Sequence, residues 1–236
     1  MSPTSVEGIV IRAIKYSDSQ LIVHLFTKEY GRISTIVNRS RKKGSSNFFQ
    51  PLFHLNFEMT FTDRKSVQRI SQLRFAQPYR SIPFSITKNT IAQFISEVLS
   101  KVVPENEPDK DLFLFLSNAI HLFDEVDENA QYFHLVFLVH LTRFLGVFPG
   151  RRGPENTFFS PSEGTYVSKI MHDTIPDELS DQFDKLVSIP LSQFNSLQLK
   201  KDTQKELLAH LIDFYRVQLN VGELKTYAVL KQIFSN

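Results

Sequence analysis

Hydrophobic and polar positions alternate along the first third of the chain, most strictly in residues 52–61. The hydrophobic face of that stretch consists of Phe53, Leu55, Phe57, Met59 and Phe61. A period of two is typical of a β-strand with one buried face. Four other runs of strand length, rich in β-branched and aromatic residues, cover 6–14, 21–27, 32–38 and 67–75. Five short strands favour a small barrel of the OB type, with an SH3-like barrel or a small sandwich as alternatives.

After residue 80 the spacing of hydrophobic residues changes to three and four, which predicts helices. The predicted helices cover residues 87–103, 111–124, 129–145, 203–219 and 225–234. The third is apolar on nearly every side, so we expect it to be the central helix of a bundle. Thr203 and Glu206 have the spacing of a capping box, which predicts that the fourth helix opens at Thr203.

These patterns together predict an α+β chain with two domains. We expect residues 1–80 to form the five-stranded OB-fold barrel and residues 81–236 to form an α-helical domain. An irregular insertion, rich in Gly, Pro and Ser, is expected in that second domain at about 148–175. The chain has 236 residues, which is long enough for two domains that each bury a core.

The distribution of charge adds a functional signal to this division. The whole chain has a formal net charge of only +2, but residues 1–80 contain 13 Lys+Arg and 5 Asp+Glu, a net of +8. Residues 81–236 contain 14 Lys+Arg and 20 Asp+Glu, a net of −6. Such an asymmetry indicates that the basic part has a polyanion as its partner.

Composition and motifs exclude several classes of function. The chain has no cysteine, which rules out disulfides, thiolate zinc sites, iron–sulfur clusters and a cysteine nucleophile. We find none of the phosphate-binding, dinucleotide-binding, metalloprotease or serine-hydrolase motifs, and therefore expect no enzyme and no catalytic residue. The opening residues do not have the pattern of a secretory signal, and the longest apolar run, 133–141, is too short to span a bilayer. These features predict a cytoplasmic, nucleoid-associated protein.

The strongest positive signal is a basic stretch between the third and fourth predicted strands. Four cations within five residues, Arg39, Arg41, Lys42 and Lys43, precede Phe48 and Phe49. Cations in a loop can neutralise phosphates, and an aromatic ring can stack on a base, although a phenylalanine beside a strand is more often part of a core. The predicted DNA-binding residues are Arg12, Lys15, Arg32, Arg39, Arg41, Lys42, Lys43, Arg64, Lys65 and Arg74. A merely solvated set of loops is the alternative.

The same segments resemble a known family. Residues 7–12, 16–23 and 25–32 are similar to the opening of the bacterial recombination mediator family RecO, and residues 39–43 and 50–52 continue its pattern. The resemblance extends over nearly the whole chain, although its specific motifs lie in the first 55 residues. It implies a DNA-repair protein that binds single- and double-stranded DNA and anneals strands coated by single-stranded DNA-binding protein (SSB). It also implies that the protein helps RecR to load RecA.

The resemblance also implies two further features, one of which this sequence lacks. SSB ends in an acidic, Phe-terminated tail, for which Arg143, Arg216 and Lys225 are the candidate cations; spacing does not choose among them.

Many members of the family have a four-cysteine zinc module in the insertion, but this chain has no thiol there. Because Ser and Thr do not replace structural thiolates, we expect no metal and no cofactor. We expect a cluster of Phe148, Phe158, Phe159 and Tyr166 to hold the insertion instead.

Two rival functions share parts of this evidence. An RNA- or ribosome-associated OB-fold protein would have the same basic loops, and competition between single-stranded DNA and RNA would distinguish it. An enzyme with its site in residues 148–175 would need a nucleophile, a base and an orienting group, and we recognise no such set in the sequence.

Overall fold

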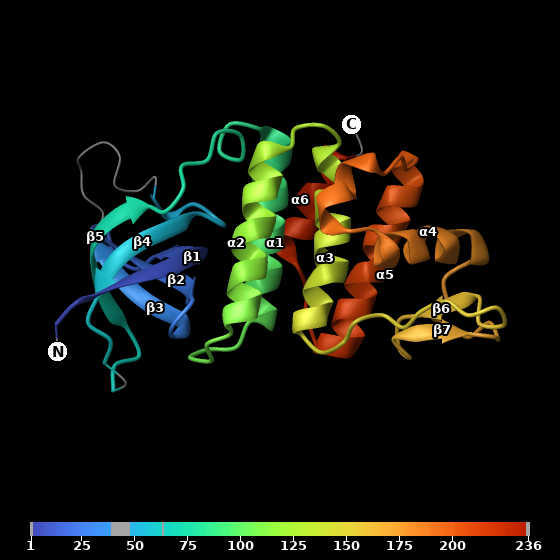
Figure 1. Ribbon diagram of the computed structural model, residues 1–236, viewed down its shortest axis with the longest axis horizontal. Helices are drawn as coiled ribbons and strands as arrows, with labels where there is room; N and C mark the ends of the chain where they lie inside the picture. Colours follow the sequence, from blue (N-terminus) through green and yellow to red (C-terminus); the bar gives the residue numbers. More distant parts are fainter. Residues whose placement is uncertain (1, 39–47, 63, 235–236) are drawn as a thin grey trace. The chain divides into compact units, whose positions relative to one another are not determined.

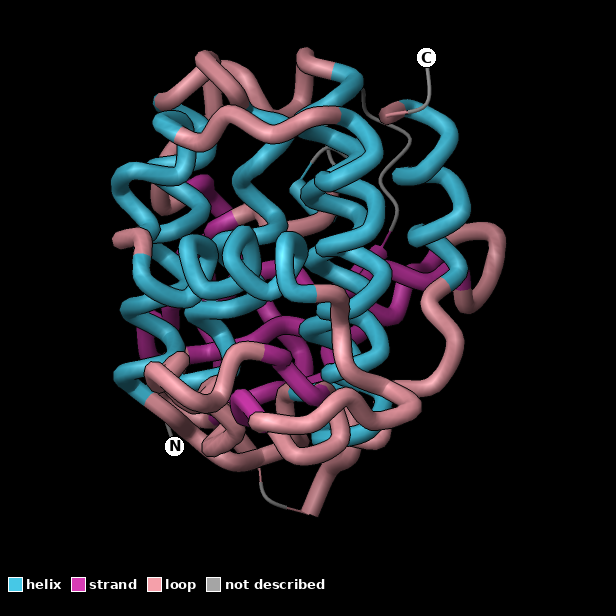
Figure 2. The backbone as a smooth tube through the Cα atoms, turned by 90° about the vertical axis from the view of Figure 1, so that its right-hand side faces the viewer, coloured by secondary structure: helices cyan, strands magenta, loops and turns pink. Residues whose placement is uncertain are grey.

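The computed structural model describes residues 2–38, 48–62 and 64–234 of the chain. The chain forms two compact units, residues 1–125 and residues 126–236. In the described residues the first unit contains five strands and two α-helices, and the second is mostly helical (Figure 1). Figure 2 colours the helices cyan and the strands magenta. The boundary between the compact units therefore follows the second helix, whereas residue 80 marks the change from strands to helices.

The five strands of the first unit close into a barrel, which confirms the predicted fold class (Figure 1). They are β1 (Thr4–Lys15), β2 (Gln20–Thr27), β3 (Gly31–Asn38), β4 (His54–Met59) and β5 (Gln68–Phe75). Their order around the barrel is β1-β2-β3-β5-β4, with β3 and β5 parallel and the other pairs antiparallel. This is the closed five-stranded arrangement of an OB fold.

Strand β1 closes the barrel because it pairs with two neighbours. Its first half pairs with β4 from Thr4 to Ile9, and its second half pairs with β2 as far as Lys15. The register with β2 shifts between Val10 and Arg12, as at a β-bulge, which bends a strand and increases its twist.

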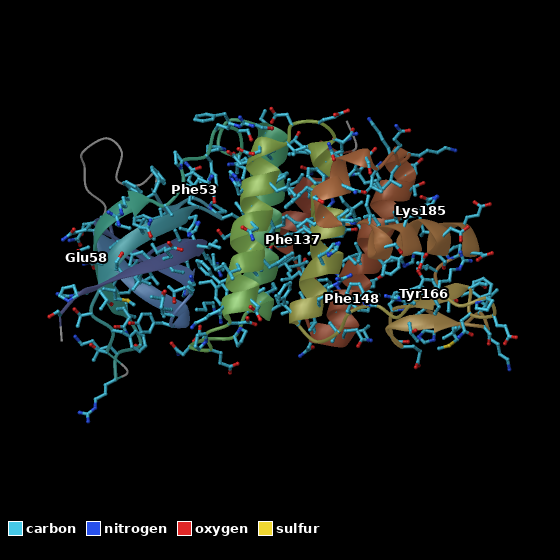
Figure 3. All side chains as sticks on the ribbon, in the orientation of Figure 1. Phe53, Glu58, Phe137, Phe148, Tyr166 and Lys185 are labelled. Carbon is cyan, nitrogen blue, oxygen red and sulfur yellow. The ribbon has the colours of Figure 1, made fainter. Side chains whose placement is uncertain are left out.

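The alternating pattern of residues 52–61 fills the barrel interior as predicted. Leu55, Phe57 and Met59 are at most 1% exposed, and they pack with Val10 and Leu25 from the neighbouring strands. Phe53 belongs to the same core, and Figure 3 labels it. Burying side chains of this size contributes about 1.5–3 kcal/mol each, so the core is the main source of stability for the barrel.

Two helices complete the first unit: α1 (Ile86–Val102) and α2 (Lys110–Glu125). The Ser96 hydroxyl of α1 donates a hydrogen bond to the Ile11 carbonyl of β1, which fixes α1 to the barrel. The last turn of α2 holds the connection from β5 to α1. There the buried Asp124 carboxylate accepts the backbone N–H groups of Arg80, Ser81 and Ile82 at 2.8–2.9 Å.

The second unit is built around α3 (Phe133–Phe144), which is buried on nearly every side as predicted; Figure 3 labels its Phe137. The other elements are η2 (Ala130–Tyr132), β6 (Phe158–Ser160), β7 (Thr165–Val167), α4 (Asp177–Ser188), η3 (Leu191–Ser196), α5 (Lys201–Leu219) and α6 (Lys225–Ile233). The buried Tyr215 hydroxyl of α5 donates to the Leu138 carbonyl at 2.7 Å and so ties α5 to α3.

Three expectations for the second unit need correction. The insertion is not wholly irregular, because β6 and β7 pair as a short antiparallel hairpin. Helix α4 and the 3₁₀ segment η3 were not predicted. Helix α5 begins at Lys201, so the prediction of a capping box at Thr203 was wrong. The side chain of Gln204, beside Thr203, instead donates to the Gln131 carbonyl at 3.0 Å, so a tertiary contact and not a local cap orders this turn.

No helix within residues 2–38, 48–62 and 64–234 is long and apolar enough to cross a membrane.

Candidate nucleic-acid interface

Several of the predicted cations lie exposed on the strands of the barrel. Arg12 follows the bulge of β1, and Arg74 is on β5 opposite Asn56 of β4. Lys15 ends β1, and its ammonium group pairs with the exposed Asp18 carboxylate at 2.7 Å. An exposed pair of this kind is weak, so the Lys15 ammonium can exchange Asp18 for a phosphate at little cost.

Arg32 has a structural position that the sequence did not reveal. Its side chain is only 18% exposed, and its guanidinium donates to the Ser100 carbonyl at 2.6 Å and pairs with Glu105 at 3.1 Å. Its own carbonyl accepts the N–H of Asn106. Arg32 therefore fastens the segment after α1 against the start of β3, and a contact with DNA stays a prediction for this residue.

The basic stretch itself, Arg39, Arg41, Lys42 and Lys43, lies outside the described residues. The neighbouring described residues are Asn38, which is exposed at the end of β3, and Phe48. Phe48 is half-buried and stacks on Phe75 with their ring centroids 4.4 Å apart. Phe49 is 7% exposed and belongs to the barrel core.

A groove of about 580 Å³ lies beside these rings. It is lined by Gln20, Ile36, Val37, Asn38, Phe48, Phe49, Arg69, Ile70 and Leu73. The groove lies where pairing between β3 and β5 is short, with only Thr35–Gln68 and Ile36–Arg69 in register. Arg69 is exposed at its rim and was missed from the sequence, where its outward position in the alternation of β5 was the available signal.

A second groove, of about 590 Å³, carries two of the predicted cations, Arg64 and Lys65, on the connection between β4 and β5. Its other lining residues are Glu29, Tyr30, Phe61, Ser66, Asn106 and Pro108. Tyr30 and Phe61 stack with their ring centroids 4.4 Å apart and an interplanar angle of 19°. Aromatic rings and cations thus line the same groove, an association that the sequence did not reveal because its residues are far apart in the chain.

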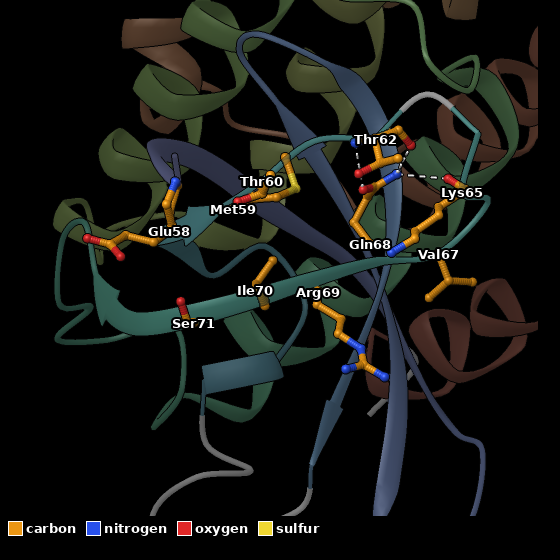
Figure 4. A pocket seen from close by; sticks show the side chains of 11 residues that line it. Glu58, Met59, Thr60, Thr62, Lys65, Val67, Gln68, Arg69, Ile70 and Ser71 are labelled. Carbon is orange, nitrogen blue, oxygen red and sulfur yellow. Dashed lines mark hydrogen bonds between the residues drawn. The ribbon is translucent and has the colours of Figure 1, made fainter. Parts of the chain in front are cut away.

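The connection between β4 and β5 is held in place by Gln68 (Figure 4). This side chain is 4% exposed; its amide nitrogen donates to the carbonyls of Thr62 and Lys65, and its amide oxygen accepts the Thr62 N–H. The three distances are 2.8–3.1 Å. A smaller groove of about 300 Å³ on this side of the barrel is also lined by Lys65 and Arg69.

Burial lowers the pKa of several histidines in the two units, among them His24 and His134. Burial lowers the pKa of His24, and the nearby guanidinium of Arg32 adds to the effect. His24 also hydrogen-bonds the Ser34 hydroxyl at 3.0 Å. Burial lowers the pKa of His134, which is fully enclosed in α3, to about 3. Neither imidazole therefore adds positive charge at neutral pH.

The cations expected to hold the SSB tail come from three helices of the second unit. Arg143 on α3 lies over the Phe148 ring, with its guanidinium carbon 4.2 Å from the ring centroid. Arg216 on α5 pairs with Asp213 at 2.9 Å. Lys225 is exposed at the start of α6. Their role as a tail-binding site stays a prediction.

The insertion is held by rings, as the sequence suggested, but by a different set of them. Phe159 is fully buried; its ring centroid lies 4.2 Å from that of Phe183 on α4 and 5.3 Å from that of Tyr166 on β7. Phe158 and Phe148 are only half-buried. Figure 3 labels Tyr166 on this hairpin.

A carboxylate supports the same hairpin. The Asp173 carboxylate accepts the Ser160 hydroxyl at 3.0 Å and the Ser162 N–H at 2.9 Å. The described part of the chain contains no group of three or more His, Asp or Glu side chains that is arranged to hold a metal ion.

The fold and these grooves define an OB-barrel protein that has cations and aromatic rings on its barrel. A helical unit follows the barrel unit in the sequence. Comparison with known proteins is more specific. Residues 1–79 match the family model described as Recombination protein O N terminal, and residues 83–228 match Recombination protein O C terminal. The chain therefore belongs to the RecO family, and its role is in DNA repair and recombination.

Individual relatives agree over nearly their full length. Proteins named DNA repair protein RecO from Flavobacterium psychrophilum and Phocaeicola vulgatus are each 32% identical, over 234 and 236 residues, with 97% of this chain and 98% of each relative covered. The protein of the same name from Bacteroides fragilis is 30% identical over 236 residues, with 96% of this chain and 97% of the relative covered.

Proposed function

We propose that the protein is a non-enzymatic recombination mediator that binds single- and double-stranded DNA through its barrel. In this proposal it anneals complementary strands coated by SSB and, together with RecR, helps to load RecA. The observation that supports it is the set of exposed cations around two grooves of the barrel, in a chain that belongs to the RecO family. The net charge of +8 within residues 1–80 points the same way.

The chemistry of these contacts suits annealing. Lys and Arg bind phosphates and release counterions, which gives affinity without reading sequence. A strand held by its phosphates keeps its Watson–Crick edges free to pair with a second strand. The exposed Lys65 and Arg69 side chains, which line one groove of the barrel, are therefore suited to presenting single strands of any sequence.

We infer that the second unit provides the protein contacts. An acidic peptide with a terminal aromatic residue needs a cation beside an apolar surface. Arg143 meets that description best among the three candidates, because its guanidinium already rests on the half-buried Phe148 ring. Arg216 is engaged by Asp213, which would have to be displaced.

The test of DNA binding is the salt dependence of affinity for a single strand. Replacing Arg64, Lys65 and Arg69 by Ala should weaken binding to all sequences alike and reduce the log–log salt slope by about 0.7 per lost phosphate contact, so about 2 in all. A matched control replaces three exposed lysines of the second unit, Lys169, Lys185 and Lys200. An unchanged slope in the barrel variant, or an equal change in the control, would contradict the proposal.

The test of the mediator role is annealing. Wild-type protein should accelerate pairing of complementary strands coated by SSB, and the barrel variant should lose that acceleration while the lysine control keeps it. Annealing of bare strands alone, without any effect on SSB-coated strands, would reduce the function to simple DNA binding.

A further inference from the structure

The groove that contains Tyr30 and Phe61 combines two chemical features. One wall is an aromatic stack of two half-buried rings. The neighbouring rim carries the exposed side chains of Arg64 and Lys65. An aromatic face binds a flat apolar ring, and adjacent cations bind an anion. An unpaired nucleotide offers both groups, a base and a phosphate, within one monomer.

Asn106 and Pro108 of the groove belong to the segment after α1, which packs closely against the turn between β2 and β3. Gly31 has a positive φ of 66°, and a Cβ atom there would lie 2.4 Å from the Glu107 carbonyl oxygen. Only glycine therefore lets the segment after α1 approach the turn between β2 and β3 so closely. The ion pair between Arg32 and Glu105 and the hydrogen bond from Asn106 to Arg32 fix the segment in that position. The groove is thus preformed, which lowers the entropic cost of binding.

The charged side chains around the groove determine where the phosphates of a bound strand can lie. Glu29 is exposed on the rim and would repel a phosphate, so the backbone of a bound strand runs along Arg64 and Lys65. Glu29 and Asn106, which are both exposed at the edge of the groove, can accept hydrogen bonds from ring or exocyclic N–H groups of a base bound beside them. The volume, about 590 Å³, lies within the range of about 300–1,000 Å³ that is typical of small-molecule sites.

We propose that this groove is a nucleotide subsite that holds one unpaired base of single-stranded DNA on the Tyr30–Phe61 stack. The inference rests on the proposed DNA-binding function and adds the chemical class that the site selects. In a duplex the bases are paired and stacked inside the helix, so the rings cannot reach them without unpairing. The groove therefore gives the barrel a preference for single strands over duplex, which phosphate contacts alone do not provide.

The first experiment is photocrosslinking of the wild-type protein to an oligothymidine strand that contains 5-iododeoxyuridine. The tryptic peptide 29–32 contains Tyr30 as its one aromatic residue, so a crosslink there is unambiguous. A crosslink at Tyr30 or Phe61 supports the proposal. Crosslinks confined to other parts of the chain overturn it, and no variant is needed for this result.

The second experiment compares affinities for a single strand and for a duplex of the same length. Tyr30→Leu with Phe61→Leu keeps apolar volume but removes both ring faces, and should weaken single-strand binding by about fivefold or more. Duplex binding should change by less than about twofold, and the salt slope should stay that of wild type because no phosphate contact is lost. Phe84→Leu, an exposed ring outside the groove, is the matched control and should have no effect.

The conservative pair Tyr30→Phe and Phe61→Tyr keeps both ring faces and should retain single-strand affinity, which separates stacking from a loss of fold. An equal loss for single strand and duplex, or no loss at all, overturns the subsite. The proposed function fails if the wild-type protein binds no DNA, or if replacing Arg64 and Lys65 leaves the salt slope of its DNA affinity unchanged. If those replacements reduce the salt slope but the substitutions of Tyr30 and Phe61 do not change single-strand affinity, this inference alone fails.

Discussion

The two compact units use their cations differently. On the barrel, Arg64, Lys65 and Arg69 are exposed around grooves. In the second unit, Arg152 binds the Asp177 and Asp181 carboxylates of α4. Paired charges stabilise their own unit, whereas exposed charges beside concave surfaces are available to a polyanion. In the proposal above, the exposed cations beside the barrel grooves bind DNA, whereas Arg152 stabilises the packing of the second unit.

The two β structures differ in a related way. The barrel closes on itself and encloses a continuous apolar core. The hairpin of β6 and β7 has only three residues in each strand, which is too short to be stable alone. It depends on the buried Phe159 ring and on the Asp173 carboxylate that bridges Ser160 and Ser162. These contacts lie in the insertion, where this chain has no cysteine that could hold a zinc ion.

The largest expected effect tests whether that hairpin is independent of DNA binding. Phe159→Ala removes a fully buried ring and should cost about 3–5 kcal/mol in the free energy of unfolding of the second unit. Limited proteolysis should become faster between residues 150 and 169, while DNA affinity stays near wild type. Phe158→Ala, at a half-buried position, should have a smaller effect. Equal protease resistance in both variants would show that the rings do not hold the insertion.

The next effect concerns the basic stretch between β3 and β4. Replacing Arg39, Arg41, Lys42 and Lys43 by Ala should flatten the salt slope on single strands by about 3, if each contacts one phosphate. The same relation gives a loss of roughly several hundred-fold in affinity at about 0.1 M salt. Filter binding over a range of salt concentrations measures both values. If the slope does not change, this stretch is only solvated and the grooves alone bind DNA.

A smaller effect on stability should appear at the connection between barrel and helices. Burial alone would raise the pKa of Asp124, but hydrogen bonds from Ile82, Arg80 and Ser81 outweigh it and hold the pKa below its usual value of 3.8. A lowered pKa stabilises the folded state above that value, and the stabilisation is lost as pH falls below it. In Asp124→Asn an NH₂ group replaces one carboxylate oxygen, so one of the backbone N–H groups loses its acceptor. The substitution should lower the free energy of unfolding by about 1–3 kcal/mol at pH 7.

Urea unfolding at several pH values checks this expectation. The difference between wild type and Asp124→Asn should shrink as pH falls below 3.8, because the carboxyl group protonates first in the unfolded state and then, at lower pH, in the folded state. Asp111→Asn, an exposed carboxylate on the same helix, is the control and should change stability less. A difference that is constant with pH would show that the charge of Asp124 does not matter.

A still smaller effect tests whether Gln68 positions the cations of the second groove. Gln68→Met keeps the length of the side chain but removes its three hydrogen bonds to the connection between β4 and β5. Affinity for single strands should fall by about threefold, because the backbone that carries Arg64 and Lys65 is then less rigidly held and binding must order it. The same substitution should have no further effect on DNA binding once Arg64 and Lys65 are Ala. An additional loss in that background would mean that Gln68 acts elsewhere.

The smallest expected effect is on metal dependence. Purified protein should contain no stoichiometric zinc, and a chelator should leave the thermal midpoint unchanged. Elemental analysis and thermal unfolding with and without chelator measure this. A lowered midpoint would show that a metal stabilises the insertion in addition to Phe159 and Asp173.

Local pattern was sufficient for much of the architecture. The alternation in residues 52–61 predicted both β4 and its buried face, since period two leaves no other arrangement of apolar side chains. The nearly all-apolar segment around α3 predicted a central helix for a similar reason. The capping box failed because helix α5 begins at Lys201, with Lys200 as its N-cap residue, so that Thr203 already lies in the first turn. The side chain next to it, Gln204, donates to Gln131, a residue 73 positions away, and local spacing does not predict a contact at that separation.

For the candidate site, the sequence determined that residues 1–80 are basic, because charge is a property of composition. Only the tertiary structure decided which of them share a surface. Tyr30 in the turn after β2 meets Phe61 in the connection after β4, because β2 and β4 both pair with β1. Arg32 turns inward because the segment after α1 returns to it. Strand pairing and chain return are long-range events, so the nucleotide groove could be found only in the folded chain.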